Sequence, residues 1–550
     1  MKIFSYWTHS TFSRLLTFAV LIQFCVSGSV TAQTLTDSNL PIIIMDTHGQ
    51  TILDDPRIIV DIGIIDNGIG VRNYVTDPQN DYFGQVAIEI RGSTSQQYTK
   101  KSYGFETRDS LLLDTSVSLL GMPEENDWIL YGAYPDKTLL RNTFAYYTFN
   151  RMGHYASRTR HVELVRNGSY RGVYELFEKI KRDDHRVDIA KLTPADTVGD
   201  SLTGGYIIKI DKTTGNGTQF WYSSFDSEVN FQYDYPEDID LVQVQKDYIQ
   251  NYVYEFESAL QGPAFTDPDS GYIKYIDMES FIDFFLMQEL GRTVDGYRSS
   301  CFMYKDKDSK GGKLTMGPLW DFNLSFGNCD YCSAYDTTGY QYNFNSICTG
   351  YDPHVPFWWG RLLQDPNYAD QVQCRWKIMR ASFLHTDSVN AWIDSMASYL
   401  NESQQRNFQK WQILGQYVNW NYFVGQTYQE EIDYLKTWIA NRSTWLDNNL
   451  PGVCDLYTSI ATAENIISCK FYPNPFSHAT FLQMQVGDEH ISNLTLNIYD
   501  VTGRNVFEKN IAVRNQKVKE ELQLDLNPGM YFYTVGSKEI TGKSGKLVVQ

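Results

Sequence analysis

The spacing of apolar residues changes along the chain, and the first region reads as strands. From Leu40 to about Gly215, short β-branched and aromatic runs are bounded by Gly, Asn and Asp, which is typical of strands. We expect strands at 58–64, 85–90, 161–165 and 205–210. One helix interrupts them, because apolar residues recur there at helical spacing: Leu139, Leu140, Phe144, Ala145 and Tyr147.

The next region, from about Val244 to Asn449, carries apolar stripes of helical period. They predict helices at 244–260, 278–290, 368–384, 386–400 and 428–445. A hairpin from Cys301 to Phe322 is inserted among them. After residue 465 the alternation again has period two, with strands expected at 494–499 and 530–535. This tail is expected to form a small antiparallel β-sandwich.

Charge divides the chain at the same place. The segment 466–550 holds nine basic and eight acidic side chains, whereas the chain as a whole has a net charge of −19. A boundary near 455–465 follows, and 550 residues leave room for several domains. The predicted parts are 1–32, a signal peptide; 40–243, an α+β part; 244–454, a helical part; 455–465, a linker; and 466–550, the tail.

The N-terminus has the pattern of a secretory signal. Lys2 and Arg14 are basic, an apolar stretch runs from Leu15 to Val26, and Val30-Thr-Ala32 is a small-x-small cleavage site. This stretch is shorter than the roughly 20 residues that span a bilayer, and no other stretch is long enough. We therefore expect an exported protein without a transmembrane segment beyond the signal. The strongly acidic charge also argues against nucleic acid as a partner.

Seven cysteines remain after the signal is removed. Exported cysteines are usually paired, and an odd number leaves at least one thiol free or bonded to another chain. The pair Cys329 and Cys332 has the spacing of half a zinc site, but the chain has no second pair of this kind. We favour disulfides, with Cys332 to Cys348 as the candidate bond.

Two aspartates flank the predicted hairpin. Asp295 follows a predicted helix, and Asp321, beside Asn323, comes after the second hairpin strand. Phosphoryl transfer needs one carboxylate to accept the proton of the attacking hydroxyl and another to hold a metal ion on the nucleotide phosphates. The plainer alternative is structural, because Asp-Gly is a turn signal and a Trp-Asp pair can cap a strand.

The spacing of these residues is similar to that of protein kinases. In kinases a metal-binding Asn lies five residues after the catalytic Asp, and a hairpin leads to Asp-Phe-Gly. In this chain the fifth residue after Asp295 is Ser300, and Asp321-Phe-Asn323 stands in place of the tripeptide.

A longer series of motifs resembles the CotH family of secreted kinases. In order, they are Ile90-Arg-Gly-Ser-Thr-Ser95, Lys100-Lys-Ser-Tyr103, Asn126-Asp-Trp-Ile-Leu-Tyr131, Leu139-Leu-Arg-Asn142, the run from Glu163 to Lys179, Arg186-Val187, Gly204-Gly-Tyr206 and the Asp295 and Asp321 segments. The resemblance covers most of residues 40–330 and extends through the helices to about 450. It implies an α+β, atypical protein-kinase-like domain of two lobes, a mixed β N-lobe and a helical C-lobe.

The resemblance also implies an activity. The family transfers phosphate from ATP, with Mg²⁺ or Mn²⁺, to Ser or Thr of an exported protein. Asp295 matches the catalytic Asp and Asp321 the metal-binding Asp. Ser300 departs from the Asn commonly found at its position, and Asn323 is the alternative metal ligand.

Residues that contact the ATP phosphates are predicted around the first motif. The loop from Arg91 through Ser93 offers backbone donors and hydroxyls to an anion. The phosphate-binding cation is Lys101, Lys179 or Lys209, with Lys101 our first choice and Lys179 the second, and Glu178 or Glu175 is expected to orient it as an ion-pair partner. The plainer alternative is that a Lys at a strand edge keeps its amine in solvent.

The tail resembles the type A sorting domain of type IX secretion. The motifs are Phe471-Tyr-Pro-Asn-Pro-Phe476, Ile498-Tyr-Asp-Val-Thr-Gly-Arg504, Leu526-Asn-Pro-Gly-Met-Tyr531 and Gly545-Lys-Leu-Val-Val549. The resemblance implies contact with the type IX secretion machinery. It also implies release or attachment at the outer-membrane surface, often with removal of the tail.

Two other functions compete with a kinase. One is an inactive kinase fold that serves as a surface structural or adhesion module, which Ser300 favours. The other is carbohydrate binding through an aromatic platform of Pro356-Phe-Trp-Trp-Gly360 with Trp411, Trp420 and Tyr422, although aromatics at helical spacing are usually core residues.

Overall fold

The computed structural model describes residues 34–213, 219–351, 353–454, 466–486, 492–500, 505–514, 516–537 and 540–549. The expected signal peptide and the expected linker at 455–465 lie outside these residues. Among the described residues, no helix is both long and apolar enough to cross a membrane.

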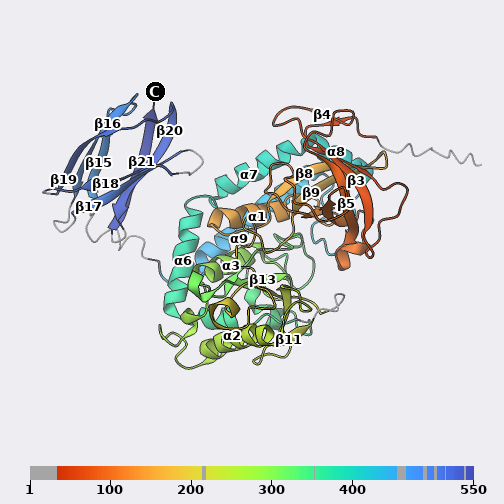
Figure 1. Cartoon of the computed structure of the whole chain (residues 1–550), viewed down its shortest axis with the longest axis horizontal. Coiled ribbons are helices and arrows are strands. Elements are labelled where there is room, and N and C mark those ends of the chain that lie inside the picture. Colours follow the sequence, from red (N-terminus) through yellow and green to blue (C-terminus); the bar gives the residue numbers. More distant parts are fainter. Residues whose placement is uncertain are drawn as a thin grey trace, which may run out of the picture.

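The N-terminal region is a closed β-barrel (Figure 1). Its strands are β2 (Ile42–Asp46), β3 (Ile58–Ile65), β5 (Tyr82–Arg91), β6 (Ser102–Arg108), β7 (Asp127–Tyr131), β8 (Thr159–Arg166) and β9 (Ser169–Glu178). They neighbour one another in the order β2-β3-β5-β6-β7-β9-β8, and the parallel pair β2–β8 closes the ring of otherwise antiparallel pairs. Inward-facing apolar side chains such as Ile62, Trp128 and Leu176 fill it.

Helix α1 (Arg141–Met152) lies between barrel strands β7 and β8 in the sequence and packs against the helical region. It follows β7, and Gly153 ends it in the left-handed conformation that favours glycine. Its apolar residues, including Phe144 and Phe149, belong to the large cluster that also contains the C-terminal helices. The short strands β1 (Asp37–Ser38) and β4 (Asn73–Tyr74) pair with each other.

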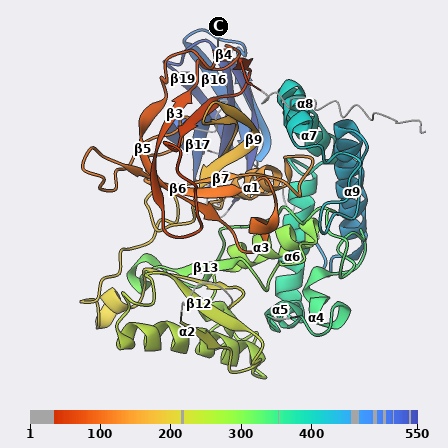
Figure 2. The same ribbon diagram turned by 90° about the vertical axis from the view of Figure 1, so that its right-hand side faces the viewer.

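A second sheet follows the barrel. Its strands, in spatial order, are β11 (Phe220–Tyr222), β12 (Asn230–Tyr235), β10 (Tyr206–Ile210), β13 (Cys301–Lys305) and β14 (Thr315–Met316), all antiparallel. Helix α2 (Gln243–Gln261) lies along this sheet (Figure 2). Ile249, Val253 and Phe256 of α2 share one apolar cluster with Ile208 and Phe231 of the sheet.

Helix α3 (Met278–Gly291) lies at the centre of the helical region, and its residues from Ser280 to Gly291 are all buried. It contacts α1, α6 and α9. The other helices are α4 (Phe344–Ile347), α5 (Trp358–Leu362), α6 (Pro366–Arg380), α7 (Thr386–Tyr399), α8 (Asn401–Lys410) and α9 (Tyr428–Asn449). Short 3₁₀ turns are η1 (Thr94–Gln97), η2 (Gly199–Leu202), η3 (Tyr272–Lys274), η4 (Asp308–Lys310) and η5 (Gln341–Asn343).

The tail consists of two antiparallel sheets. One contains β15 (Ile466–Tyr472), β16 (Ala479–Val486) and β19 (Lys517–Gln523); the other contains β18 (Asn505–Ala512), β17 (Asn493–Tyr499), β20 (Gly529–Ser537) and β21 (Ile540–Val549). Both contribute to one apolar cluster, with Leu482 from the first sheet and Leu496 and Val535 from the second.

The expected α+β character is confirmed, with strands and helices at the predicted places. Helix α8 was not predicted, because its buried positions are polar and carry no apolar stripe: Ser403, Gln404 and Asn407 are buried beside Phe408. Asn407 instead accepts hydrogen bonds from the backbone N–H of Val173 and the ammonium of Lys100. The helix therefore packs on β9 of the barrel through polar contacts.

The predicted disulfide between Cys332 and Cys348 is present, with a Cα–Cα distance of 5.3 Å. A second disulfide, Cys374 to Cys454, was not predicted and joins α6 to the segment after α9. Cys301 and Cys329 are buried thiols. Because Cys332 is bonded to Cys348, the pair Cys329 and Cys332 is not half of a zinc site.

Candidate active-site cleft

The two aspartates that flank the hairpin lie in one cleft of about 770 Å³. Its walls come from the ends of barrel strands, from the end of β10 and from the connections that follow α3 and β14. Asp295, Asp321, Asn323 and Ser300 all line it. The structure therefore brings together the carboxylates that the sequence analysis singled out, and their chemical roles stay predictions.

Asp295 lies in the turn after α3. Its backbone carbonyl accepts hydrogen bonds from the N–H groups of Arg298 and Ser299, at 3.2 and 2.8 Å. Its side chain is 16% exposed, with Arg298 Nη1 at 3.8 Å and Lys212 Nζ at 4.0 Å from Oδ1. The carboxylate is thus reachable from the cleft, as a group that accepts a proton from a substrate must be.

Asp321 lies in the loop after β14, five residues beyond the last residue of that strand. Its φ of +61° is in the left-handed region, which costs a non-glycine residue about 1–3 kcal/mol. Helix α1 holds this conformation: the N–H of Asp321 donates to the Tyr146 hydroxyl at 3.2 Å, and the N–H of Phe322 donates to Asn142 Oδ1 at 2.8 Å.

The surroundings of Asp321 disfavour its charged form. Burial, helped by the charges of Asp295 and Asp211 and opposed by those of Lys212 and Arg91, raises the pKa of Asp321 to about 6. Among the described residues, no hydrogen bond or ion pair reaches its carboxylate. A buried carboxylate beside other carboxylates and without a partner fits a divalent cation.

The donor set also fits the way Mg²⁺ binds with nucleotides. Within the described ranges, no three His, Cys, Asp or Glu side chains form a cluster that holds a metal by itself. Mg²⁺ at nucleotide sites takes only one or two carboxylates and completes its shell with phosphate oxygens and water. Asp321, with Asn323 nearby in the cleft, meets that requirement.

The Arg91 loop forms another wall, with Arg91 and Ser93 both lining the cleft. The Arg91 guanidinium lies 5.1 Å from the centroid of the Trp320 ring. Burial lowers the pKa of Arg91, and the charge of Asp321 opposes this shift. Gly92 has a φ of +103°, so the sharp turn that brings Ser93 to the cleft requires glycine.

The remaining predicted phosphate ligands lie in different places. Lys179 lines the cleft, with its Nζ 3.3 Å from Asp127 Oδ1. Lys101 is not among the lining residues, and its ammonium donates to the carbonyl of Gln96. Glu178 is fully buried and pairs with Arg158 at 2.6 Å. Because Glu178 pairs with Arg158 and Lys179 with Asp127, these two neighbours do not form the expected ion pair with each other.

Asp211 and Lys212 also line the cleft, and the sequence analysis missed them. They follow β10, and the available signal was a pair of charged residues directly after the strand expected at 205–210. Burial raises the pKa of Asp211, although Lys209 and backbone donors from Lys212 and Ser300 oppose the rise.

The aromatic residues suggested as a carbohydrate platform do not share one surface: Tyr422 is 49% exposed and stacks on Tyr335, whereas the tryptophans lie in other places. Trp358 and Trp359 are 0% and 1% exposed and belong to the large apolar cluster. Trp411 donates its indole N–H to the carbonyl of Arg171 at 2.8 Å. Trp420 lies elsewhere, in the wall of the cleft.

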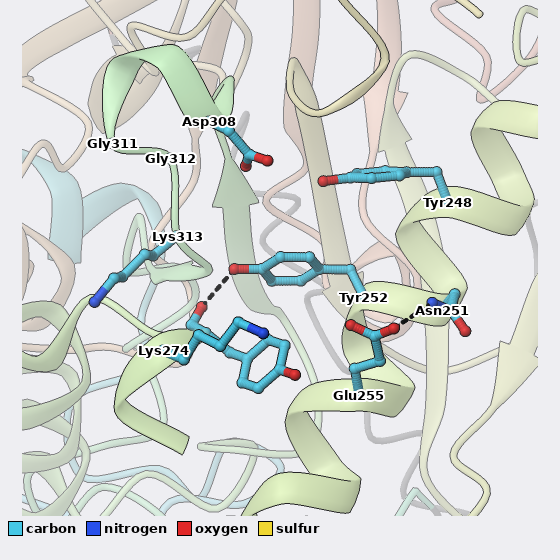
Figure 3. Close-up of a pocket in the computed structure, with 10 residues that line it drawn as sticks. Tyr248, Asn251, Tyr252, Glu255, Lys274, Asp308, Gly311, Gly312 and Lys313 are labelled. Atoms are coloured by element: carbon cyan, nitrogen blue, oxygen red, sulfur yellow. Dashed lines mark hydrogen bonds between the residues drawn. The ribbon is translucent and has the colours of Figure 1, made fainter. Parts of the chain in front are cut away.

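A second pocket, of about 460 Å³, lies between α2 and the turn that joins β13 to β14. Tyr248 and Tyr252 project from α2 toward Asp308 on that turn (Figure 3). Beneath them, buried Lys305 pairs with Asp308 at 2.7 Å and lies 4.6 Å from the Tyr252 ring centroid. This pocket lies beside an ion pair between a buried lysine and an exposed aspartate, and it contains none of the predicted site residues.

Fold and cleft together define an α+β protein with a large polar cleft that gathers carboxylates and cations. Residues 88–446 match the family model described as CotH kinase protein, and this match covers more than half of the 550 residues. The chain therefore belongs to the CotH kinase protein family. No curated protein matches the chain. The family match begins within β5, whereas the barrel also needs β2 and β3, which come earlier in the sequence.

Residues 470–550 match the secretion system C-terminal sorting domain. The match covers nearly all of the tail and confirms the second resemblance. A tail of this kind implies interaction with the type IX secretion machinery, and it indicates a secreted or cell-surface protein.

Proposed function

We propose that the protein is an exported kinase that transfers the γ-phosphate of ATP to Ser or Thr of an exported or surface protein. The observation that carries this proposal is the meeting of Asp295 and Asp321 in one cleft, although 25 residues and a hairpin separate them in the sequence. In this proposal the barrel acts as the N-lobe and the helical region as the C-lobe of an atypical kinase.

The residues of the cleft divide the reaction between them. Asp295 accepts the proton of the acceptor Ser or Thr hydroxyl, and the oxygen of that hydroxyl forms a bond to the γ-phosphorus. The bond from the γ-phosphorus to the β,γ-bridging oxygen breaks at the same time, and ADP is released. Asp321, with Asn323, holds the metal ion. When bound, Mg²⁺ or Mn²⁺ neutralises charge on the phosphate oxygens. Arg91, Ser93 and Lys179 are the candidate contacts to the rest of the triphosphate.

Incorporation of labelled γ-phosphate tests the proposal. The mature chain is incubated with ATP, Mg²⁺ or Mn²⁺ and co-secreted proteins, and wild type is compared with Asp321→Ala. A matched control is Asp184→Ala, because Asp184 is 83% exposed and its one ion pair among the described residues is a surface pair with Arg182. We expect incorporation by wild type and the control and none by Asp321→Ala, with all three showing cooperative thermal unfolding.

Ser300 favours a second candidate function. It lines the cleft at the position where the family commonly has a metal-binding Asn. An inactive kinase fold that serves as a surface adhesion or structural module fits that departure. Wild-type protein that neither incorporates phosphate nor shows a thermal shift with Mg²⁺ and ATP would replace the kinase proposal with this one.

A further inference from the structure

Most cations that line the cleft already have a fixed partner. Arg57 pairs with Glu89 and Glu106, Lys179 pairs with Asp127, and Lys209 pairs with Asp234. The Arg91 guanidinium lies over the Trp320 ring. Lys212 differs from them, because its nearest carboxylate among the described residues is Asp295 at 4.0 Å, beyond hydrogen-bond distance. Its side chain is 46% exposed and faces the cleft.

The backbone of Lys212 is nevertheless firmly placed. The register of β10 and β13 pairs Ile210 with Cys301, so the residues after β10 come beside Ser300 and the turn of Asp295. Buried Gln232 on β12 donates its amide N–H groups to the carbonyls of Asp211 and Lys212, at 2.8 and 3.0 Å. Within the described residues, Lys212 thus has a fixed backbone and an ammonium without a hydrogen-bond partner, and this arrangement leaves the ammonium available to a ligand.

Lys212 shares the cleft with both aspartates. Its ammonium lies 4.0 Å from the Asp295 carboxylate, and Asp321 lines the same cleft. The ammonium is therefore close to the proposed base and faces the same space as the proposed metal ligand. The group to be transferred must occupy this same space, because it meets the acceptor oxygen on one side and the metal ion on the other.

We propose that Lys212 binds the γ-phosphoryl group of ATP during transfer; this inference rests on the proposed kinase function. The transferred group carries charge on three oxygens in the transition state, and a preplaced cation stabilises that charge. Lysine suits this role because its compact ammonium on a flexible stem follows the phosphorus between donor and acceptor.

The test compares ATP with ADP, since only ATP has a γ-phosphate. Lys212→Met, Lys212→Arg and the control Lys310→Met are prepared in the mature chain. Lys310 is an exposed lysine outside the cleft whose ammonium lies 3.4 Å from an Asp306 oxygen. The affinities for ATP and ADP with Mg²⁺ are measured by calorimetry, and the transfer rate is measured in a single turnover.

We expect Lys212→Met to weaken ATP binding about tenfold, to leave ADP binding unchanged and to slow transfer by about 10²-fold or more, as for loss of one transition-state donor. Lys212→Arg should regain part of both losses, and Lys310→Met should behave as wild type. If Lys212 only neutralised Asp295, its replacement by Met would leave the preference for ATP over ADP unchanged.

Two results overturn the inference in distinguishable ways. If wild type transfers phosphate and Lys212→Met retains both the rate and the ATP preference, the kinase stands and Lys212 is not a phosphate ligand. If wild type neither transfers phosphate nor prefers ATP, the proposed function fails and the inference fails with it. Should Lys212→Met not fold, Lys212→Gln carries the same comparison.

Discussion

Two pockets of this protein contain acidic, basic and aromatic side chains but differ in how some of their charges are used. At the pocket between α2 and the hairpin turn, Asn251 donates to Glu255, and buried Lys305 behind the lining donates to Asp308 and to the carbonyl of Thr203. In the cleft, Asp295 and Lys212 stay 4.0 Å apart, and no described partner reaches the carboxylate of Asp321. Charges that are satisfied internally stabilise a fold, whereas charges held close without bonding are available to a ligand.

The largest expected effect comes from the base in the cleft. Asp295→Asn keeps the shape of the side chain but cannot accept a proton, so phosphate transfer should fall by about 10²–10⁴-fold. ATP affinity and the thermal unfolding temperature should stay close to those of wild type. A rate within a few-fold of wild type in a single-turnover assay would show that Asp295 is not the base.

Asp321 should make stability depend on pH. Its pKa rises to about 6 in the folded protein from an ordinary value of 3.8, so the folded state binds the proton more tightly than the unfolded state does. Metal-free stability should therefore fall as pH rises from about 4 to about 6, and Asp321→Asn should relieve about 1–3 kcal/mol of this penalty at pH 7.

Denaturant unfolding of wild type and Asp321→Asn at pH 4 and pH 7 measures this difference. Added Mg²⁺ and ATP should shift the unfolding temperature of wild type more at pH 7 than at pH 5, because protons compete for a metal-binding carboxylate. Equal destabilisation of Asp321→Asn at both pH values would instead show that the side chain is an ordinary structural residue.

In the second pocket the expected effect is on stability alone. Lys305→Met leaves the carbonyls of Thr203 and Asp306 without the ammonium that donates to them, so the free energy of unfolding should fall by about 1–3 kcal/mol. Phosphate transfer should be unchanged at temperatures where the variant is folded. A loss of transfer in the fully folded variant would make this pocket part of the active site.

Tyr252→Phe should have the smallest effect. It removes one hydrogen bond, from the Tyr252 hydroxyl to the carbonyl of Tyr275 at 2.9 Å, and keeps the ring. The expected loss is about 0.5–1.5 kcal/mol in denaturant unfolding, with ATP affinity unchanged. A larger change in ligand binding than in stability would contradict the distinction between the two pockets.

The sequence predicted local elements well because their signals are local. Strands such as β3 and helices such as α3 carry an apolar period that is visible in a short window. Closure of the barrel is not visible in this way, because it depends on the parallel pairing of β2 with β8, more than 100 residues later. Helix α8 was missed for a related reason: its partners are polar groups on β9 and not a stripe of its own.

The sequence predicted those site residues that belong to a recognisable motif. Asp295 and Asp321 were identified by their spacing and by the family resemblance. Lys212 comes 83 residues before Asp295 and reaches the cleft only through the pairing of Ile210 with Cys301. Lys101 was our first choice for the phosphate cation because it lies in a family motif, yet the direction of its side chain was not readable from the sequence.

The disulfide between Cys374 and Cys454 affects how the chain withstands pulling and proteolysis. It anchors the last residues before the tail to α6, where Lys377 and Asp370 also hold the backbone of Cys454 and Val453. Tension applied to the tail during export is passed to α6 through a covalent bond before it reaches α9. A protease that removes the tail beyond Cys454 would likewise leave a new end that is already fastened and cannot fray into the helices.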